Sequence, residues 1–242
     1  MTNTDEQKIC EIYTDDTIRF YKSKRKESIF NEGIVNPTFR QILLSLNPGN
    51  KKILDIGCGY GADLEFLKDS GVKNLTGIDA SASCVRLVKE NVKLDNIDVY
   101  EQGIYNIELN NKFDIAYSNM VLDQVDDLDS AFKNVAKTLN KNGVYVFSVA
   151  HPLNTATNDY SAPLVDYFSR FTGRYKPKTL NKELFYYHRT FEYYSEALKR
   201  NGFAITGINE PRPTNEFFKI NYRKSIIYNN LPAALIISAQ LL

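Results

Sequence analysis

The stretch Lys51–Gly61 constrains the fold more than any other part of the sequence, because its character changes twice within a few residues. An apolar run ends at Asp55-Ile56, and glycines follow at positions 57, 59 and 61. A short apolar run suits a buried parallel strand, while glycine lets the backbone turn sharply and lets a ligand approach the main chain. Residues 62–70 then show the apolar spacing of a helix and end at Gly71. The stretch therefore predicts a strand, a glycine loop and a helix that together present backbone N–H groups to a nucleotide-like ligand.

Two kinds of nucleotide site compete for this loop. The spacing Gly57-x-Gly59-x-x-Ala62 also fits the dinucleotide-binding fingerprint. However, Asp55 stands two residues before the first glycine, where a carboxylate would repel a pyrophosphate but suits a ligand that carries an ammonium group. An ordinary strand-to-helix turn without a ligand is the structural alternative.

The line Leu54-Asp55-Ile56-Gly57-Cys58-Gly59-Tyr60-Gly61 resembles the first motif of class I S-adenosylmethionine-dependent methyltransferases. The resemblance implies S-adenosyl-L-methionine as the cofactor and S-adenosyl-L-homocysteine as its product. Asp55 would organise the amino end of the cofactor, and the loop would hold its methionine portion through Gly57, Cys58, Gly59 and Gly61. It also implies that helices within residues 1–46 fold over the cofactor and place an aromatic residue against it. We expect Tyr21 in that place, with Tyr13 and Phe30 as alternatives.

Length and charge limit the class of protein. The 242 residues suffice for one sizeable α/β domain, and we predict a single domain over residues 1–242. The formal net charge of +1 creates no global field that would attract nucleic acid, so a nucleic-acid substrate is not favoured. The three cysteines match neither a disulfide framework nor a zinc site, which favours a reduced, cytoplasmic protein without a metal. The polar N-terminus does not resemble a signal peptide, and no stretch has the length of a membrane span, so we expect no membrane partner.

A second carboxylate follows the next predicted strand, residues 74–79. Asp79 stands at the tip of that strand, where an acidic side chain can accept hydrogen bonds from both ribose hydroxyls, and Ala80 follows it. Residues 97–101 predict a third strand before Gly103 and Ile104. Relatives of this fold usually carry an acidic residue at the position of Ile104, which meets the adenine amino group. Here the backbone N–H of Ile104 stays available to the adenine ring, while the side-chain contact is either absent or supplied by Gln102.

The fourth predicted strand, residues 113–119, ends at Asn119, which we also assign to the cofactor site. Asp123 follows in an acid-rich turn, at a position where many relatives have histidine. In that fold the position lies close to the transferring methyl group, so a carboxylate there could hold a cationic amine substrate or accept its proton. The alternative is a carboxylate that merely favours the N-terminus of a helix.

His151 ends the fifth predicted strand, residues 144–149 with Ala150, at the carboxyl edge where open α/β sheets bind ligands. The pattern from His151-Pro152 through Tyr187-His188-Arg189-Thr190 is similar to small-molecule methyltransferases such as the aminocoumarin C-methyltransferases, in which this histidine is taken as the base toward a phenol. The arginine that assists there is not matched, because Ala150 stands at its position. We predict that His151→Ala keeps cofactor affinity and loses turnover.

Residues 151–190 predict a helical and aromatic lid over the substrate. We assign substrate contacts in it to Tyr160, Tyr167 and His188, with anchoring of the lid as the favoured alternative for the histidine.

The C-terminal part predicts a helix capped by Thr190, a sixth strand at residues 203–209 and a last strand at residues 233–241, reached by a short return without a helical crossover. The predicted fold is a Rossmann-like, seven-stranded and mostly parallel sheet with an antiparallel last strand and helices on both faces. The predicted activity is methyl transfer to an O, N or C atom of a small molecule that resembles a secondary metabolite. A peptide amino terminus or RNA as substrate, and a cofactor-binding scaffold without activity, are the competing hypotheses.

Overall fold

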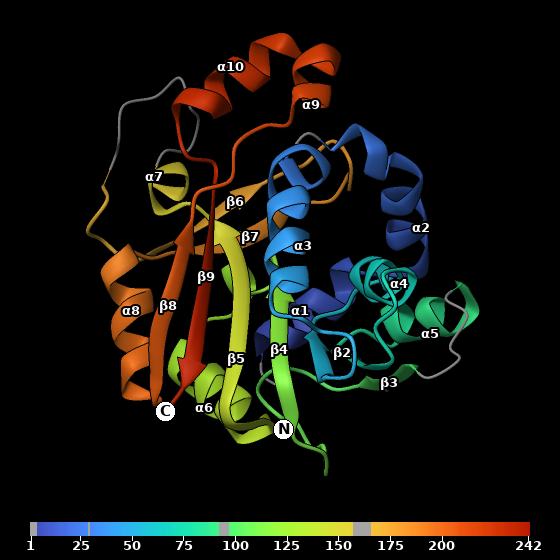
Figure 1. The fold of residues 1–242 in the computed structure, drawn as a ribbon. Coiled ribbons are helices and arrows are strands. Elements are labelled where there is room, and N and C mark those ends of the chain that lie inside the picture. The colour runs from blue at the N-terminus through green and yellow to red at the C-terminus, as the bar shows by residue number, and fades with distance from the viewer. Residues whose placement is uncertain (1–3, 29, 92–96, 157–165) are drawn as a thin grey trace.

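The computed structural model describes residues 4–28, 30–91, 97–156 and 166–242. A seven-stranded sheet in the order β3-β2-β1-β4-β5-β9-β8 forms its centre (Figure 1). Strands β3, β2, β1, β4 and β5 pair in parallel, and β9 runs antiparallel to both β5 and β8. The strands are β1 (Lys52–Ile56), β2 (Asn74–Asp79), β3 (Ile97–Glu101), β4 (Phe113–Asn119), β5 (Leu139–Ala150), β8 (Phe203–Asn209) and β9 (Ala234–Leu241). The prediction of a mostly parallel sheet with an antiparallel last strand is confirmed.

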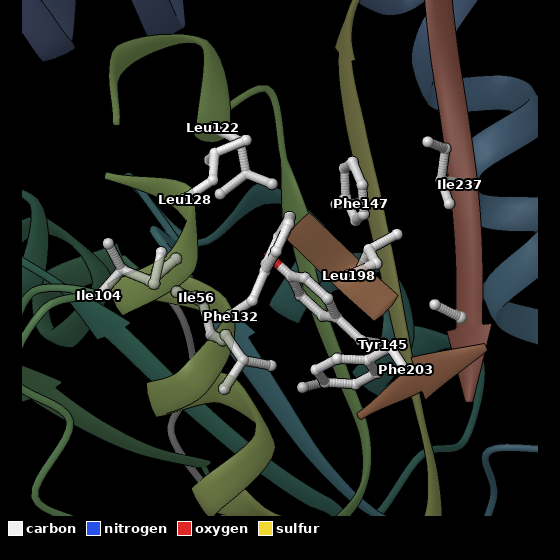
Figure 2. Packing of buried hydrophobic residues seen from close by; sticks show 14 of the residues in the cluster. Ile56, Ile104, Leu122, Leu128, Phe132, Tyr145, Phe147, Leu198, Phe203 and Ile237 are labelled. Carbon is white, nitrogen blue, oxygen red and sulfur yellow. The ribbon is translucent and has the colours of Figure 1, made fainter. Parts of the chain in front are cut away.

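Helices cover both faces of the sheet because neighbouring strand residues point to opposite sides. Ile53 packs in a cluster with α3 (Asn36–Ser45), α4 (Ala62–Asp69) and α5 (Ala82–Asn91). The next residue, Leu54, packs in a second cluster with α6 (Leu128–Thr138) and α8 (Phe191–Arg200). Figure 2 shows this second cluster, in which the ring of Phe132 lies 5.6 Å from that of Phe147, centroid to centroid. The two cores hold the central strands in place, and with them the carboxyl edge of the sheet.

The N-terminal part forms α1 (Thr4–Ile12), α2 (Asp15–Lys24), a 3-10 turn η1 (Arg25–Glu27) and a π-helical turn η2 (Asn31–Val35) that runs directly into α3. Asn36-Pro37 has the sequence of a helix start, with a capping side chain before a proline. The residue before it, Val35, is already helical, so the backbone N–H groups at this point are satisfied by the preceding turn. The Asn36 side chain is therefore free for the polar cluster described below.

The predicted short return from the sixth to the last strand is wrong. Two helices, α9 (Asn215–Ile220) and α10 (Tyr222–Asn230), lie between β8 and β9. They are fastened to the N-terminal part, since Thr214 N donates to Gly33 O (3.0 Å) and a Cβ atom on Gly33 would lie 2.3 Å from the Phe217 ring. The insertion is therefore held by contacts with a segment that is remote in the sequence.

The predicted helical lid also needs correction. After the short helix α7 (Pro152–Thr155), the described part of residues 151–190 forms a β-hairpin from β6 (Phe171–Tyr175) and β7 (Leu184–His188). In β7, Leu184, Tyr186 and His188 are buried and the residues between them are not, which is the period of two of a strand. The segment is therefore rich in aromatic residues, as predicted, but its described part after α7 forms a β-hairpin and not further helices.

Thr190 caps α8 as predicted, because its side-chain oxygen accepts a hydrogen bond from Tyr193 N (3.2 Å). We expect Thr190→Ala to lower the free energy of unfolding by about 1 kcal/mol, since it leaves an N–H group of the first helical turn without its partner. Urea denaturation measures this change. Ser195→Ala, in the interior of the same helix, serves as the control and should leave stability nearly unchanged; equal effects of the two variants would contradict a capping role.

Candidate active site

The glycine loop joins β1 to α4 and is tied to the neighbouring strand, because Gly57 N and Cys58 N both donate to Ile78 O (2.8 and 2.9 Å). Gly57, Gly59 and Gly61 have φ angles of 76°, 55° and 85°, a left-handed region that favours glycine. A Cβ atom on Gly57 would lie 2.5 Å from the Val121 side chain, whereas one on Gly59 would meet nothing within 4 Å. The loop is thus packed against protein at Gly57 and borders open space at Gly59, where a ligand can approach its main chain.

Asp79 fastens the end of β2 to this loop. Its Oδ2 atom accepts a hydrogen bond from Gly59 N (2.8 Å), and its Oδ1 atom accepts one from Ser81 N (2.9 Å). Burial raises the pKa of Asp79, and the two backbone N–H groups partly offset that effect. Each carboxylate oxygen retains further acceptor capacity, which fits the predicted contact with ribose hydroxyls.

Asp55 lies at the end of β1 with its carboxyl group buried, and its Oδ2 atom accepts a hydrogen bond from the Tyr117 hydroxyl (2.9 Å). Tyr117 stands in register beside Asp55 on β4. Burial raises the pKa of Asp55 well above its usual range, and the nearby Asp63 carboxylate adds to that effect. A cationic group bound here would reverse the shift, so the acidic pair is suited to an ammonium group. Tyr117 was not predicted, because its neighbour is distant in the sequence.

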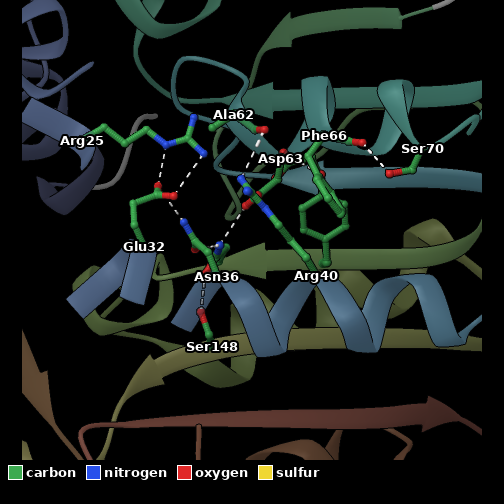
Figure 3. Close-up of polar contacts among 12 residues, drawn as sticks. Arg25, Glu32, Asn36, Arg40, Ala62, Asp63, Phe66, Ser70 and Ser148 are labelled. Carbon is green, nitrogen blue, oxygen red and sulfur yellow. Dashed lines mark hydrogen bonds and ion pairs between the residues drawn. The ribbon is translucent and has the colours of Figure 1, made fainter. Parts of the chain in front are cut away.

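A cluster of polar side chains under the glycine loop joins four elements (Figure 3). Asn119 Nδ2 donates to Asp63 Oδ2 (2.8 Å) and to Asn36 Oδ1 (2.9 Å), and its Oδ1 atom accepts from Ser148 Oγ (2.6 Å). Arg40 Nε donates to Asp63 Oδ1 (2.7 Å). The amide of Asn119 is therefore engaged by protein groups on both sides, which favours a role in holding the cofactor site in shape over a direct contact. No pattern in the sequence marks Asp63, Asn36 or Arg40 as members of this cluster.

The predicted aromatic contact from the N-terminal helices involves Tyr21. Its hydroxyl accepts a hydrogen bond from Asn31 Nδ2 (2.6 Å), and its ring meets the edge of the Tyr60 ring in the glycine loop at 5.9 Å between centroids. Tyr21 is thus placed against the predicted methionine side of the loop.

The loop after β3 has no acidic side chain at position 104, as the sequence shows. Ile104 is buried in the α6 face of the core, so its side chain does not face a ligand (Figure 2). Gln102 bonds within its own loop, with its side-chain nitrogen donating to Glu108 O (3.2 Å) and its oxygen accepting from Glu108 N (3.0 Å). Ala80 O accepts a hydrogen bond from the Cys10 thiol (3.1 Å), which brings α1 to this edge.

Asp123 lies in the 3-10 turn η3 (Leu122–Gln124) that follows β4, and only 7% of its surface is exposed. Ala150 N, at the end of β5, donates to both of its carboxylate oxygens (3.2 and 3.0 Å). Burial raises the pKa of Asp123 to about 7, although Ala150 N–H and the Arg189 guanidinium act in the opposite direction. A carboxyl group with this pKa can exchange a proton near neutral pH.

Arg189 holds the turn that carries Asp123. Its guanidinium is buried and donates to the carbonyl oxygens of Leu122 (3.3 Å) and Asp126 (2.8 Å) and to that of Val125. The residue directly follows β7, so it links the hairpin to the turn. This role of Arg189 was not predicted, because nothing near it in the sequence shows that it reaches the turn after β4.

His151 uses both ring nitrogens in contacts with protein. Nδ1 accepts a hydrogen bond from Leu153 N (3.1 Å) and caps α7, so the proton of the neutral ring lies on Nε2, which is 3.1 Å from Glu210 Oε1. Burial lowers the pKa of His151, and Glu210 partly offsets this. A base needs an open lone pair, and here the only lone pair in the ring plane faces Leu153 N–H. This geometry favours a structural role for His151 over the predicted role as a base.

His188 and Tyr167 hold the hairpin. The His188 ring is buried, its Nδ1 atom lies 2.7 Å from Thr155 Oγ1, and its Nε2 atom lies 2.9 Å from Tyr167 O. The ring also stacks on Phe171 at 4.8 Å between centroids. These contacts favour the alternative of a structural anchor for His188 over a substrate contact. Tyr160, also predicted to contact substrate, lies outside the described residues.

In the part of the chain that the structure describes, no helix is both long and apolar enough to cross a bilayer. The described His, Cys, Asp and Glu side chains also form no group of three or more suited to a metal ion.

Comparison with known proteins agrees with this geometry. A family model described as a methyltransferase domain matches residues 35–208. The structure is similar to S-adenosylmethionine-dependent methyltransferases from Mesorhizobium loti (TM-score 0.73, 27% identity, 84% of this chain and 96% of that chain) and Listeria monocytogenes (TM-score 0.70, 26% identity, 86% and 99%). An uncharacterised Haemophilus influenzae protein is 22% identical over 88% of this chain and 93% of its own length.

Relatives with a named activity match shorter stretches. This chain spans 29% to 38% of the length of three bacterial ribosomal protein L11 methyltransferases. Others are named for malonyl-acyl carrier protein or for ubiquinone and menaquinone biosynthesis, so the named relatives differ in substrate.

The fit of the cofactor to the site rests on the open space at Gly59, the buried Asp55 carboxyl group at the end of β1 and the Asp79 carboxylate at the end of β2. Since the family model covers most of the chain, this protein belongs to the methyltransferase-domain family, and it is an enzyme that uses S-adenosylmethionine.

Proposed function

We propose that this protein transfers the methyl group of S-adenosylmethionine to a small molecule, and that Asp123 takes the proton from the acceptor atom. The observation that carries the proposal is the buried Asp123 carboxyl group, whose pKa of about 7 lets it accept a proton near neutral pH. It lies just after β4 at the carboxyl edge of the sheet, where Asp55 and Asp79 stand at the ends of β1 and β2. A base at this edge suits a substrate whose reacting atom carries an O–H, N–H or acidic C–H proton.

The residues around the loop have separate roles in this proposal. Bound S-adenosylmethionine supplies an electrophilic methyl group on a sulfonium. Asp55 holds the ammonium group of the cofactor, and Asp79 holds the ribose hydroxyls. Asp123 takes the acceptor's proton as the nucleophile attacks, and Arg189 keeps the Asp123 turn in position. Alignment in a site from which water is excluded supplies most of the remaining rate enhancement.

Tyrosines support a small, partly aromatic acceptor. Burial raises the pKa of the Tyr175 hydroxyl on β6, and the Asp123 carboxylate raises it further, so Tyr175 lies near Asp123. Burial also raises the pKa of Tyr13, with Tyr175 as the next cause, so the segment after α1 and the hairpin approach each other here. Planar rings bind well between such aromatic side chains.

A ribosomal protein or another macromolecule is the second candidate, since several relatives are named for ribosomal protein L11. Incubating the enzyme with labelled S-adenosylmethionine and separated cell fractions tests both. We expect the label in the small-metabolite fraction; label confined to protein or RNA would overturn the small-molecule proposal. A parallel reaction with the Asp123→Asn variant controls for non-enzymatic labelling.

The role of His151 is tested by two substitutions that differ in capping ability. Asparagine is a good N-cap residue and alanine is not, and neither is a base at neutral pH. We expect His151→Asn to keep most of the turnover, while His151→Ala lowers the free energy of unfolding by about 1 kcal/mol. Turnover assays and urea denaturation measure the two effects. Equal, large losses of turnover in both variants, with unchanged affinity for S-adenosylhomocysteine, would instead restore His151 as the base.

A further inference from the structure

Helix α1 lies against the ends of β2 and β3, where the nucleoside part of the cofactor belongs. Cys10 contacts Ala80 O after β2, and Ser81 Oγ donates to Tyr13 O (2.9 Å) just after the helix. Tyr105 N, after β3, donates to Glu6 Oε1 (3.4 Å). Glu6 and Cys10 are one helical turn apart and share a face. This face of α1 therefore covers the carboxyl edge of both strands.

Glu6 comes unusually close to the main chain at the end of β3. Only 7% of its surface is exposed, and a Cβ atom built on Gly103 would lie 1.8 Å from its Oε1 atom. The backbone of Gly103 is not in the left-handed region, so what distinguishes this glycine is the close approach of the Glu6 carboxylate and not its φ angle. The missing side chain of Gly103 is what lets a carboxylate lie on this part of the edge.

The Glu6 carboxylate lies at the end of the strand next to the one that carries Asp79. Strands β2 and β3 are neighbours, with Asp79 in register with Glu101, and adjacent strands lie about 4.8 Å apart. If Asp79 holds the ribose, the base would lie over the end of β3, on the side of Gly103 and α1. Ile104 and Gln102 do not offer a side chain to the base there, because the first is in the core and the second is bonded to Glu108.

We propose that Glu6 is the residue that selects adenine in the cofactor, by accepting a hydrogen bond from the exocyclic amino group of the base. An ionised carboxylate only accepts hydrogen bonds, so it favours an amino group and disfavours the keto oxygen that hypoxanthine carries at the same position. The contact that the sequence lacks at position 104 is thus supplied from a helix that is remote in the sequence. The inference rests on the proposed contact of Asp79 with ribose.

Binding measurements distinguish adenine selection by Glu6 from a purely structural role in packing α1 against the sheet. S-adenosylhomocysteine and S-inosylhomocysteine, in which a keto oxygen replaces the amino group, are titrated calorimetrically into the wild-type protein and into Glu6→Gln. We expect the wild-type protein to prefer S-adenosylhomocysteine by about 10- to 100-fold, the size typical of a hydrogen bond to a charged group. Glu6→Gln should reduce or reverse this preference, because an amide can also donate to the keto oxygen.

Glu11→Gln is the matched control, since Glu11 lies on the same helix and is exposed; it should leave both affinities unchanged. A parallel fall in affinity for both ligands in Glu6→Gln, with their ratio unchanged, would show that Glu6 only fastens the helix and would overturn the proposal. Equal affinity of the wild-type protein for the two ligands would overturn it without any variant. No methyl acceptor is needed, so these results stand whether or not the proposed role of Asp123 is correct.

Discussion

Replacing Asp123 with asparagine is expected to lower kcat by about 10²- to 10⁴-fold, the range typical of the loss of a general base. Asparagine has a similar shape and can still accept the hydrogen bond from Ala150 N, so the turn after β4 should keep its structure. Affinity for S-adenosylhomocysteine should stay within about twofold of the wild type, because the loss lies in the chemical step. Steady-state kinetics on the identified acceptor, with calorimetry on the product, measures both quantities.

The same variant carries a distinct pH signature. Since the pKa of Asp123 is about 7, the wild-type kcat/KM should rise as the pH increases through that value and then level off. The rise should be absent in Asp123→Asn. Asp126→Asn, a change in the same acid-rich turn that removes an ion pair with Arg170, is the control and should keep both the rate and the pH dependence. An Asp123→Asn enzyme with wild-type kcat would exclude Asp123 as the base.

The stability of the wild-type protein should fall as the pH rises, whereas kcat/KM should increase. The folded-state pKa of Asp123 is raised from an ordinary value of 3.8, so the folded protein binds this proton more tightly than the unfolded chain does. Its contribution to stability is complete below about pH 4 and is lost as the pH rises through about 7, a difference of up to about 4 kcal/mol. Asp123→Asn should therefore be more stable relative to the wild type at pH 8 than at pH 4, as urea denaturation at the two values would show.

Replacing Asp79 with alanine is expected to weaken binding of S-adenosylhomocysteine by at least about 100-fold. The substitution removes the proposed acceptor for the ribose hydroxyls and leaves the N–H groups of Gly59 and Ser81 without their partner. It should also lower the free energy of unfolding by about 1 to 3 kcal/mol, because the Ser81 N–H group is buried and would be left unsatisfied. The glycine loop and the end of β2 are then no longer held together.

Two further variants make this result specific. Asp79→Asn keeps one acceptor oxygen and should bind S-adenosylhomocysteine with an affinity between those of the wild type and the alanine variant. Asp98→Ala, an exposed carboxylate on the adjacent strand β3, should have no effect on binding. If Asp79→Ala bound the product as tightly as Asp98→Ala, the ribose contact would have to lie elsewhere.

The sheet was predictable because the information for it is local. Strands β2, β3, β4 and β8 begin and end at the predicted residues. Buried parallel strands such as β2 and β4 are short apolar runs that the sequence shows directly. The carboxylates of Asp55 and Asp79 were found for the same reason, since each stands at or next to the end of its strand. The hairpin was missed although β7 alternates buried and exposed residues, because the density of aromatic residues concealed the period of two.

Much of the site could not be predicted, because it consists of pairs of residues that only the fold brings together. Tyr117 meets Asp55 across two strands, Arg189 reaches back to the turn after β4, and Glu6 meets Gly103 from the N-terminal helix. Neither partner of such a pair has a local pattern that identifies the other. For His151 the position was predictable and the contacts were not. The residue follows β5 as predicted, but its ring nitrogens contact Leu153 N and Glu210 Oε1.

The position of β9 has a consequence for how the protein is made. This strand is the last of the described sheet strands in the sequence, yet it lies between β5 and β8, which are both synthesised before it. During translation, β8 therefore leaves the ribosome with no neighbour to pair with among the sheet strands described, and β5 has one edge exposed. Completion of the sheet must wait until β9 has emerged, so a ribosome stalled before residue 234 would hold a nascent chain with unpaired strand edges, a substrate for chaperones.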